Sequence, residues 1–90
     1  MNIILERNRI SYVDENKEEL AFIEFPEKTA SVVILRKTFV DDRLRGMGIA
    51  SKLMEAACEE IRLHHKKVIM ECSYAKEWIK KHPEYQDILF

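Results

Sequence analysis

Glycine is scarce in this chain, and so are proline and cysteine, with two residues of each among 90. Two cysteines are too few for a disulfide framework, and neither lies in a C-x-x-C or histidine-flanked zinc pattern. We therefore expect Cys58 and Cys72 to be free thiols in a reducing compartment, and we expect no metal site. No linker, repeat or low-complexity segment interrupts the chain, which predicts a single domain over residues 1–90.

The chain also lacks an excess of one charge and a long apolar run. Its 15 Lys and Arg nearly balance its 16 Asp and Glu, so no long-range field favours nucleic acid or an anionic membrane. The longest apolar runs, such as residues 32–35, are far shorter than the roughly 20 residues that cross a bilayer. The N-terminus has no signal-peptide core. We expect a cytoplasmic protein that binds neither nucleic acid nor membranes, as a monomer or a weak homodimer.

What the chain does have is a change of hydrophobic period. Its first part consists of extended segments separated by short connections, which suit antiparallel hairpins. We expect strands at residues 2–7, 9–13, 20–25 and 31–40. Both sides of the 31–40 segment are apolar at its start, so we expect a central strand that is covered on both faces.

A helical period follows the glycines. The apolar positions after Gly48 have the 3.6-residue spacing of an amphipathic helix of about 16 residues, with Cys58 in its buried stripe. Residues 67–72 predict a fifth strand, and residues 74–81 predict a short helix that ends before Pro83. The order β-β-β-β-α-β-α indicates an α+β fold with a mixed, mostly antiparallel sheet. A helical crossover places its fourth and fifth strands parallel.

Both glycines, Gly46 and Gly48, fall between the fourth strand and the helix. The first turn of a helix has N–H groups without internal partners and the positive end of the dipole, which together favour an anion. Glycine lets a phosphate approach the backbone, and Arg43 and Arg45 add charge that pairs with phosphate oxygens. The alternative is a plain strand-to-helix turn with solvated arginines. The pattern matches neither a Walker A loop nor a Rossmann fingerprint.

Residues 40–53, V-D-D-R-L-R-G-M-G-I-A-S-K-L, resemble the acetyl-coenzyme A signature of the GNAT superfamily of N-acetyltransferases. Arg43, Gly46 and Gly48 match its core pattern in register. Cys72-Ser73-Tyr74 and the K-H-P-E-Y segment at 81–85 resemble a subfamily of very short GNAT-like proteins. The resemblance implies a GNAT-like acetyl-CoA-binding domain over residues 1–90, with the pantetheine arm of the cofactor between splayed fourth and fifth strands.

The resemblance also implies which residues bind acetyl-CoA, because the backbone amides of the family's glycine turn hold the pyrophosphate. The implied cofactor-binding residues are Phe39, Val40, Arg43, Arg45, Gly46, Met47, Gly48, Ile49, Ala50 and Ser51. The amides around Phe39 and Val40 are candidate oxyanion donors. Two features depart from the family: Arg7-Asn8-Arg9 leaves no room for the usual helices between the first two strands, and Ile79 stands near the usual general-acid tyrosine.

Cys72 and Tyr74 are the candidate catalytic residues. Cys72 ends the fifth strand, where it could accept the acetyl group or merely neighbour the bound thiol. The phenol of Tyr74 could protonate the leaving thiolate. The alternatives are that Cys72 is a small buried hydrophobe and that Tyr74 is a packing residue. For His82 the two interpretations are a base and a side chain that satisfies helix-end carbonyls.

We therefore predict a GNAT-like N-acetyltransferase that transfers acetyl from acetyl-CoA to an unidentified amine, on a small molecule or a protein, by direct attack. The alternative is a non-catalytic acyl-CoA-binding or regulatory module that has kept the cofactor site. A third hypothesis, an interaction domain without a cofactor, requires the glycine turn to be a coincidence.

Overall fold

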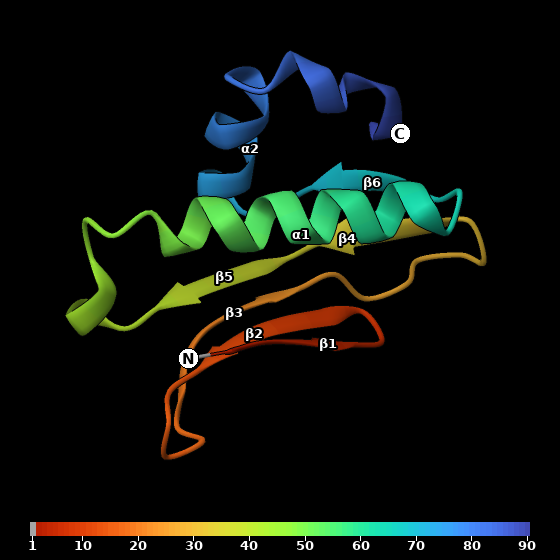
Figure 1. Cartoon of the computed structure of the whole chain (residues 1–90). Helices are drawn as coiled ribbons and strands as arrows, with labels where there is room; N and C mark the ends of the chain where they lie inside the picture. The colour runs from red at the N-terminus through yellow and green to blue at the C-terminus, as the bar shows by residue number, and fades with distance from the viewer. Residues whose placement is uncertain (1) are drawn as a thin grey trace.

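An antiparallel meander opens the chain in the computed structural model, which describes residues 2–90 (Figure 1). Strands β1 (Asn2–Glu6), β2 (Arg9–Val13) and β3 (Glu19–Glu24) pair in sequence, and β5 (Lys37–Val40) completes a sheet in the order β1-β2-β3-β5. The β1–β2 connection is a two-residue turn with Asn8 at φ 62°, a region that asparagine tolerates. No helix separates the first two strands, as the sequence predicts.

The prediction of one continuous central strand over 31–40 is wrong. This segment forms two strands, β4 (Val32–Leu35) and β5, which belong to different sheets. β4 pairs in parallel with β6 (Lys67–Met70), whereas β5 pairs with β3. The strand changes sheet at Arg36, whose N–H donates to the Glu24 carbonyl at 3.0 Å. β5 is consequently an edge strand and is only partly buried.

The parallel arrangement of the fourth and fifth predicted strands is confirmed for β4 and β6. Their ladder ends where the Leu35 carbonyl accepts hydrogen bonds from the N–H groups of both Glu71, at 3.0 Å, and Cys72, at 3.2 Å. The fifth strand therefore stops at Met70 rather than at Cys72. Beyond Leu35 the chain turns toward β3, so β5 and the end of β6 diverge (Figure 1).

Helix α1 (Ile49–Leu63) lies across one face of the four-stranded sheet (Figure 1). The predicted apolar stripe is confirmed, since its members from Leu53 to Ile61 are at most 2% exposed and pack on the inward side chains of β2 and β3. Cys58 is fully buried in this stripe, as expected for a core residue. Burial of this stripe is the main hydrophobic contribution of α1 to folding.

Helix α2 (Ser73–Lys80) and a 3₁₀ segment, η2 (Pro83–Ile88), pack the C-terminal part against α1. Trp78 joins the two helices because its indole N–H donates to the Ser51 hydroxyl at 2.9 Å. Tyr85 donates to Glu59 at 2.7 Å, and the ring of His82 stacks on Trp78 with 3.6 Å between the centroids. His82 Nδ1 lies 2.7 Å from the Trp78 carbonyl, which favours the structural interpretation of this histidine.

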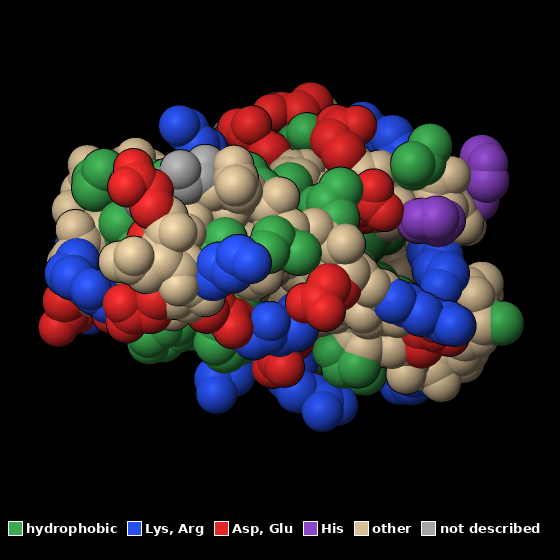
Figure 2. Space-filling model, turned by 60° about the horizontal axis from the view of Figure 1, so that its bottom comes forward, with side chains coloured by type: hydrophobic (Ala, Val, Ile, Leu, Met, Phe, Trp, Pro, Cys, Tyr) green, Lys and Arg blue, Asp and Glu red, His purple; other side chains and the backbone are tan. Residues whose placement is uncertain are grey.

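The opposite face of the sheet is covered by no helix in the part of the chain that the structure describes (Figure 1). Figure 2, which brings this side forward, shows hydrophobic side chains interspersed with charged ones. Phe22 and Phe39 lie side by side there with ring centroids 5.5 Å apart, and the Arg9 guanidinium lies 4.4 Å from the Phe22 centroid.

Within residues 2–90, no helix is long and apolar enough to cross a membrane.

Truncation of a core residue of α1 tests the packing of this helix on the four-stranded sheet. Leu53 is fully buried, so Leu53→Ala should lower the free energy of unfolding by about 3 kcal/mol because it leaves a cavity. Leu63→Ala is the matched control on the same helix, where the side chain is 67% exposed and the expected change is below about 0.5 kcal/mol. Urea unfolding followed by circular dichroism measures both; equal effects would contradict the assigned packing.

Candidate active site

Gly46 and Gly48 both adopt left-handed backbone conformations, with φ values of 80° and 72°. A Cβ atom added to either would meet no heavy atom within 4 Å. The requirement for glycine is therefore conformational, and the space above the turn is open. The turn lies between a short 3₁₀ segment, η1 (Asp42–Leu44), and the first residue of α1.

The N-terminus of α1 is not compensated by a capping side chain. Gly48 is the N-cap residue, and the first turn of α1 contains no acidic residue. The N–H groups of Ile49, Ala50 and Ser51 have no intrahelical acceptors, because the first turn of any helix lacks them. The Ser51 hydroxyl accepts the indole N–H of Trp78. The unpaired N–H groups of this turn and the positive end of the helix dipole favour an anion.

The two arginines of the turn are held by carboxylates. Arg43 donates to Asp41 at 2.9 Å and to Glu18 at 3.0 Å, and its side-chain and backbone hydrogen bonds lower the pKa of Asp41 to about 2. Arg45 pairs with Asp42 at 2.9 Å. Asp41 and Asp42 directly precede Arg43 in the sequence, but neither is among the sequence-predicted site residues. Arg43 thus ties the turn to the chain before β3, whereas Arg45 borders the groove described next.

A groove of about 540 Å³ runs beside this turn. It is formed by the end of β5, η1 and the first residues of α1 and α2. The lining residues are Thr38, Phe39, Val40, Asp41, Asp42, Arg45, Ala50 and Tyr74. The fold therefore brings five sequence-predicted residues to one groove, from segments that are up to 35 positions apart (Phe39 to Tyr74). Thr38, Asp41 and Asp42 also line the groove but are not among the sequence-predicted site residues.

The free edge of β5 borders the groove. The Leu20 and Glu24 carbonyls accept the N–H groups of Asp41 and Arg36, which flank β5. Because backbone groups alternate in direction along a strand, those of Phe22 also point toward β5 and pair with Phe39. The N–H of Phe39 is thus used within the sheet. The N–H groups of Thr38 and Val40 point to the free edge, which makes Val40 the better of the two predicted oxyanion donors.

Cys72 lies where β5 and β6 diverge. It is the N-cap residue of α2, and its Sγ lies 3.5 Å from Thr38 Oγ1. Burial disfavours the thiolate, but the Thr38 hydroxyl and the backbone N–H groups of Ala75, Tyr74 and Thr38 outweigh it, so the pKa of Cys72 is lowered. Burial raises the pKa of Cys58 to about 12. The two thiols therefore differ in reactivity.

Tyr74 is partly exposed and lines the groove from the first turn of α2. Burial, followed by the charge of Cys72, raises the pKa of its phenol above the ordinary value of 10. The phenol is therefore protonated at neutral pH and can donate a proton. Ile79 is buried in the core, so this position of α2 supplies no proton donor to the groove.

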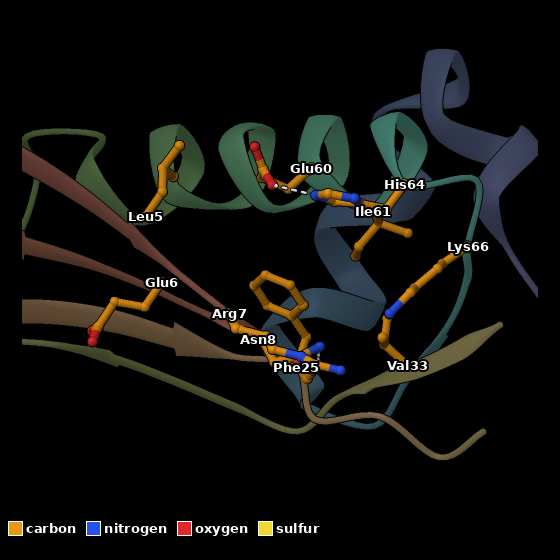
Figure 3. A pocket seen from close by; sticks show the side chains of 10 residues that line it. All are labelled: Leu5, Glu6, Arg7, Asn8, Phe25, Val33, Glu60, Ile61, His64 and Lys66. Atoms are coloured by element: carbon orange, nitrogen blue, oxygen red, sulfur yellow. Dashed lines mark hydrogen bonds and ion pairs between the residues drawn. The ribbon is translucent and has the colours of Figure 1, made fainter. Parts of the chain in front are cut away.

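A second cavity, of about 420 Å³, lies at the opposite end of α1 (Figure 3). Its buried walls include Phe25, Val33 and Ile61, and Lys66 points into it from the segment after α1 (Figure 3). None of the sequence-predicted site residues lines this cavity. Among the described residues, no group of three or more His, Cys, Asp or Glu side chains could hold a metal ion. The candidate active site is thus the groove beside the glycine turn.

Residues 9–88 match a protein family described as GCN5-related N-acetyl-transferase. The chain belongs to this family. The GNAT superfamily predicted from the glycine turn is thereby confirmed, and acyl transfer is the general chemistry of its members.

Solved structures agree with this assignment. The chain is similar to a candidate GCN5-like N-acetyltransferase from Staphylococcus aureus, with 32% identity over 99% of this chain and 87% of that one, and a TM-score of 0.79. Ard1 from Thermoplasma volcanium shares the fold at 23% identity, with a TM-score of 0.66 over 88% of this chain and 54% of that one. An acetyltransferase from Trypanosoma brucei matches at 21% identity over 91% of this chain and 60% of that one, with a TM-score of 0.58.

The difference between the two thiols is testable. At about pH 7 to 8, a lowered thiol pKa strongly increases the fraction of thiolate. Iodoacetamide should therefore label Cys72 at least about tenfold faster than Cys58 in this range. The rate at Cys72 should fall as pH drops through its lowered pKa, because only the thiolate reacts. Thr38→Val should slow labelling of Cys72 and leave that of Cys58 unchanged, as measured by peptide mass spectrometry. Equal rates at the two cysteines would contradict the assigned environments.

Proposed function

We propose that this protein transfers the acetyl group of acetyl-CoA to a primary amine of a small molecule or a protein by direct attack. The observation that carries the proposal is the groove itself: the uncapped start of α1, the free edge of β5 and the phenol of Tyr74 all border one space. Acetyl-CoA supplies the activated thioester. The residues of this chain bind and orient acetyl-CoA and donate a proton to the departing sulfur.

The start of α1 is the proposed pyrophosphate site. Its first-turn N–H groups, from Ile49 to Ser51, lack internal partners, and the left-handed glycines keep side chains away from the turn. Arg45 is exposed and is held only by a surface ion pair with Asp42, so exchange of that carboxylate for a phosphate requires little free energy. Arg43 is better placed to position the turn than to contact phosphate, since Asp41 and Glu18 hold it from two sides.

The free edge of β5 is the proposed binding site of the pantetheine arm. The N–H of Thr38 faces the Cys72 thiol, whereas the N–H of Val40 has no strand beside it on this edge in the described residues, so it is available to an amide or thioester oxygen. The side chain of Ala50 contributes apolar contact in the same groove. The divergence of β5 from β6 after Leu35 leaves the space for the arm.

Tyr74 is the proposed general acid. In the transfer, the amine nitrogen bonds to the acetyl carbon, the carbon–sulfur bond breaks, and the phenol protonates the departing sulfur while the amine proton passes to solvent. The raised pKa of Tyr74 keeps the proton available at neutral pH. Cys72 lies beside this position, and its lowered pKa favours the thiolate. It is therefore the alternative nucleophile, which would accept the acetyl group in a covalent route.

A binding module without catalysis is the second candidate function. It is favoured by one observation: the two-residue turn at Arg7 and Asn8 leaves no helices over the sheet edge where larger family members build an acceptor site. Such a module would use the same groove and would bind acetyl-CoA without turnover. We propose that either activity resides in a single domain. We also propose a cytoplasmic location, because both cysteines are free thiols, as is usual in a reducing compartment.

A charge placed on the turn tests the cofactor site. Gly46→Glu should abolish measurable binding of acetyl-CoA, because the new carboxylate repels the phosphates and competes for the same N–H groups. Gly46→Ala is the matched control: it carries the same backbone strain, of about 1 kcal/mol, but no charge, and should weaken binding far less. Isothermal titration measures binding, and circular dichroism verifies folding. If the wild type does not bind acetyl-CoA, the proposed function is wrong.

Removal of the phenol tests the catalytic assignment. Tyr74→Phe should lower kcat for acetyl transfer to an amine panel by about 10²-fold and leave the KM for acetyl-CoA nearly unchanged. Tyr12→Phe, on β2, is the control with the same chemical change outside the groove.

Intact-mass measurement on the same samples separates the routes. An unmodified protein with amine turnover supports direct attack, whereas acetyl on Cys72 supports a covalent route. Binding without turnover or modification supports the binding module.

A further inference from the structure

Strand β1 is an exposed edge of the four-stranded sheet. All five of its residues are exposed, although three consecutive ones are apolar: Ile3 and Ile4 are each 42% exposed and Leu5 is 55% exposed. β1 pairs with β2 on one side, and no described element pairs with its other side. An exposed apolar edge strand is a template for pairing with another strand.

β1 carries none of the features that usually prevent such pairing. Its register with β2 is regular from Asn2 to Glu6, without a bulge. It contains no lysine and no proline, and its single charge, Glu6, stands at its end. Proteins that keep edge strands solvated commonly use charges, prolines or bulges in the middle of the strand.

The register determines which backbone groups of β1 are free. Glu6 and Arg9 flank the two-residue turn, so they form a hydrogen-bonded pair, and alternation gives the same role to Ile4 with Ser11 and to Asn2 with Val13. The Asn8 carbonyl agrees with this phase because it accepts the Phe25 N–H on the β3 side at 2.9 Å. The N–H and C=O groups of Ile3 and Leu5 therefore point to the free edge.

We propose that a second copy of this chain pairs with β1 in the antiparallel direction, with a two-fold axis at Ile4. In this register Ile3 of each copy lies opposite Leu5 of the other and exchanges two hydrogen bonds with it, so the pair of strands gains four. The two Ile4 residues meet at the axis. The dimer contains one continuous sheet from the β5 of one copy to the β5 of the other.

The strand is complementary to itself in side chains as well as in backbone. Ile3 and Leu5 meet on the α1 side of the sheet and Ile4 meets Ile4 on the other side, so apolar residues face apolar residues. Glu6 lies opposite Asn2 of the second copy, so no like charges face each other directly. β5, with its groove, is the opposite edge of the sheet, so the pairing leaves both grooves accessible.

A charge at the axis tests the proposal. Sedimentation velocity from about 10 µM to about 1 mM should show a concentration-dependent dimer of the wild type, as expected for a small interface. Ile4→Lys should weaken dimerisation at least about tenfold, since two ammonium groups then meet at the axis. Leu63→Lys is the matched control: it also replaces an exposed apolar side chain, on α1, and should leave the dimer unchanged. A wild type that stays monomeric, or a dimer indifferent to Ile4→Lys, overturns the proposal.

Two further measurements examine the register. Ile4→Glu should also be monomeric, and mixing it with Ile4→Lys should restore a heterodimer because opposite charges then meet at the axis; failure of this rescue contradicts the register. Amide exchange should slow at Ile3 and Leu5 as the concentration rises. If the dimer forms through the outer face around Phe22 and Phe39 instead, those two amides will not change, which also contradicts the proposal.

Discussion

The arrangement of the active site depends on one shared acceptor, the Leu35 carbonyl. It receives the N–H groups of Glu71 and Cys72 and so ends the parallel ladder between β4 and β6. From the next residue the chain joins β3, and the strand that began in one sheet continues in another. Within residues 2–90, the opening between them leaves one edge of β5 without a partner strand, and it places Cys72 against Thr38. The groove exists because this strand changes partners.

The start of α1 supplies the second half of the site through an electrostatic arrangement. Gly48 ends the turn without a capping side chain, and the acids that could compensate the helix dipole are paired with arginines outside the helix. The protein therefore retains an uncompensated positive end beside an open groove. The surface ion pair of Arg45 requires little free energy to break, whereas Arg43 is bound from two sides and keeps the turn in place. Two arginines of one motif thus have different physical roles.

Much of this could be predicted from local pattern. The period of 3.6 after Gly48 correctly predicted α1 and the burial of Cys58, because the apolar face of a helix is recorded in the spacing of its own residues. The division of 31–40 could not be predicted in this way. Val32 to Val40 is apolar enough to be one strand, and the break at Arg36 arises from hydrogen bonds to Glu24 and to residues after β6, which are distant in sequence.

By itself, the sequence determined the glycine turn, the helix that follows it and the family to which the chain belongs, since these depend on neighbouring residues and their backbone conformations. Only the tertiary structure decided that Thr38, Cys72 and Tyr74 share one site, that Val40 rather than Phe39 presents its N–H to the groove, and that Arg43 binds Asp41 and Glu18. The physical reason is that strand register and partner choice are properties of the assembled sheet. They set the direction of each backbone group and the neighbours of each charge.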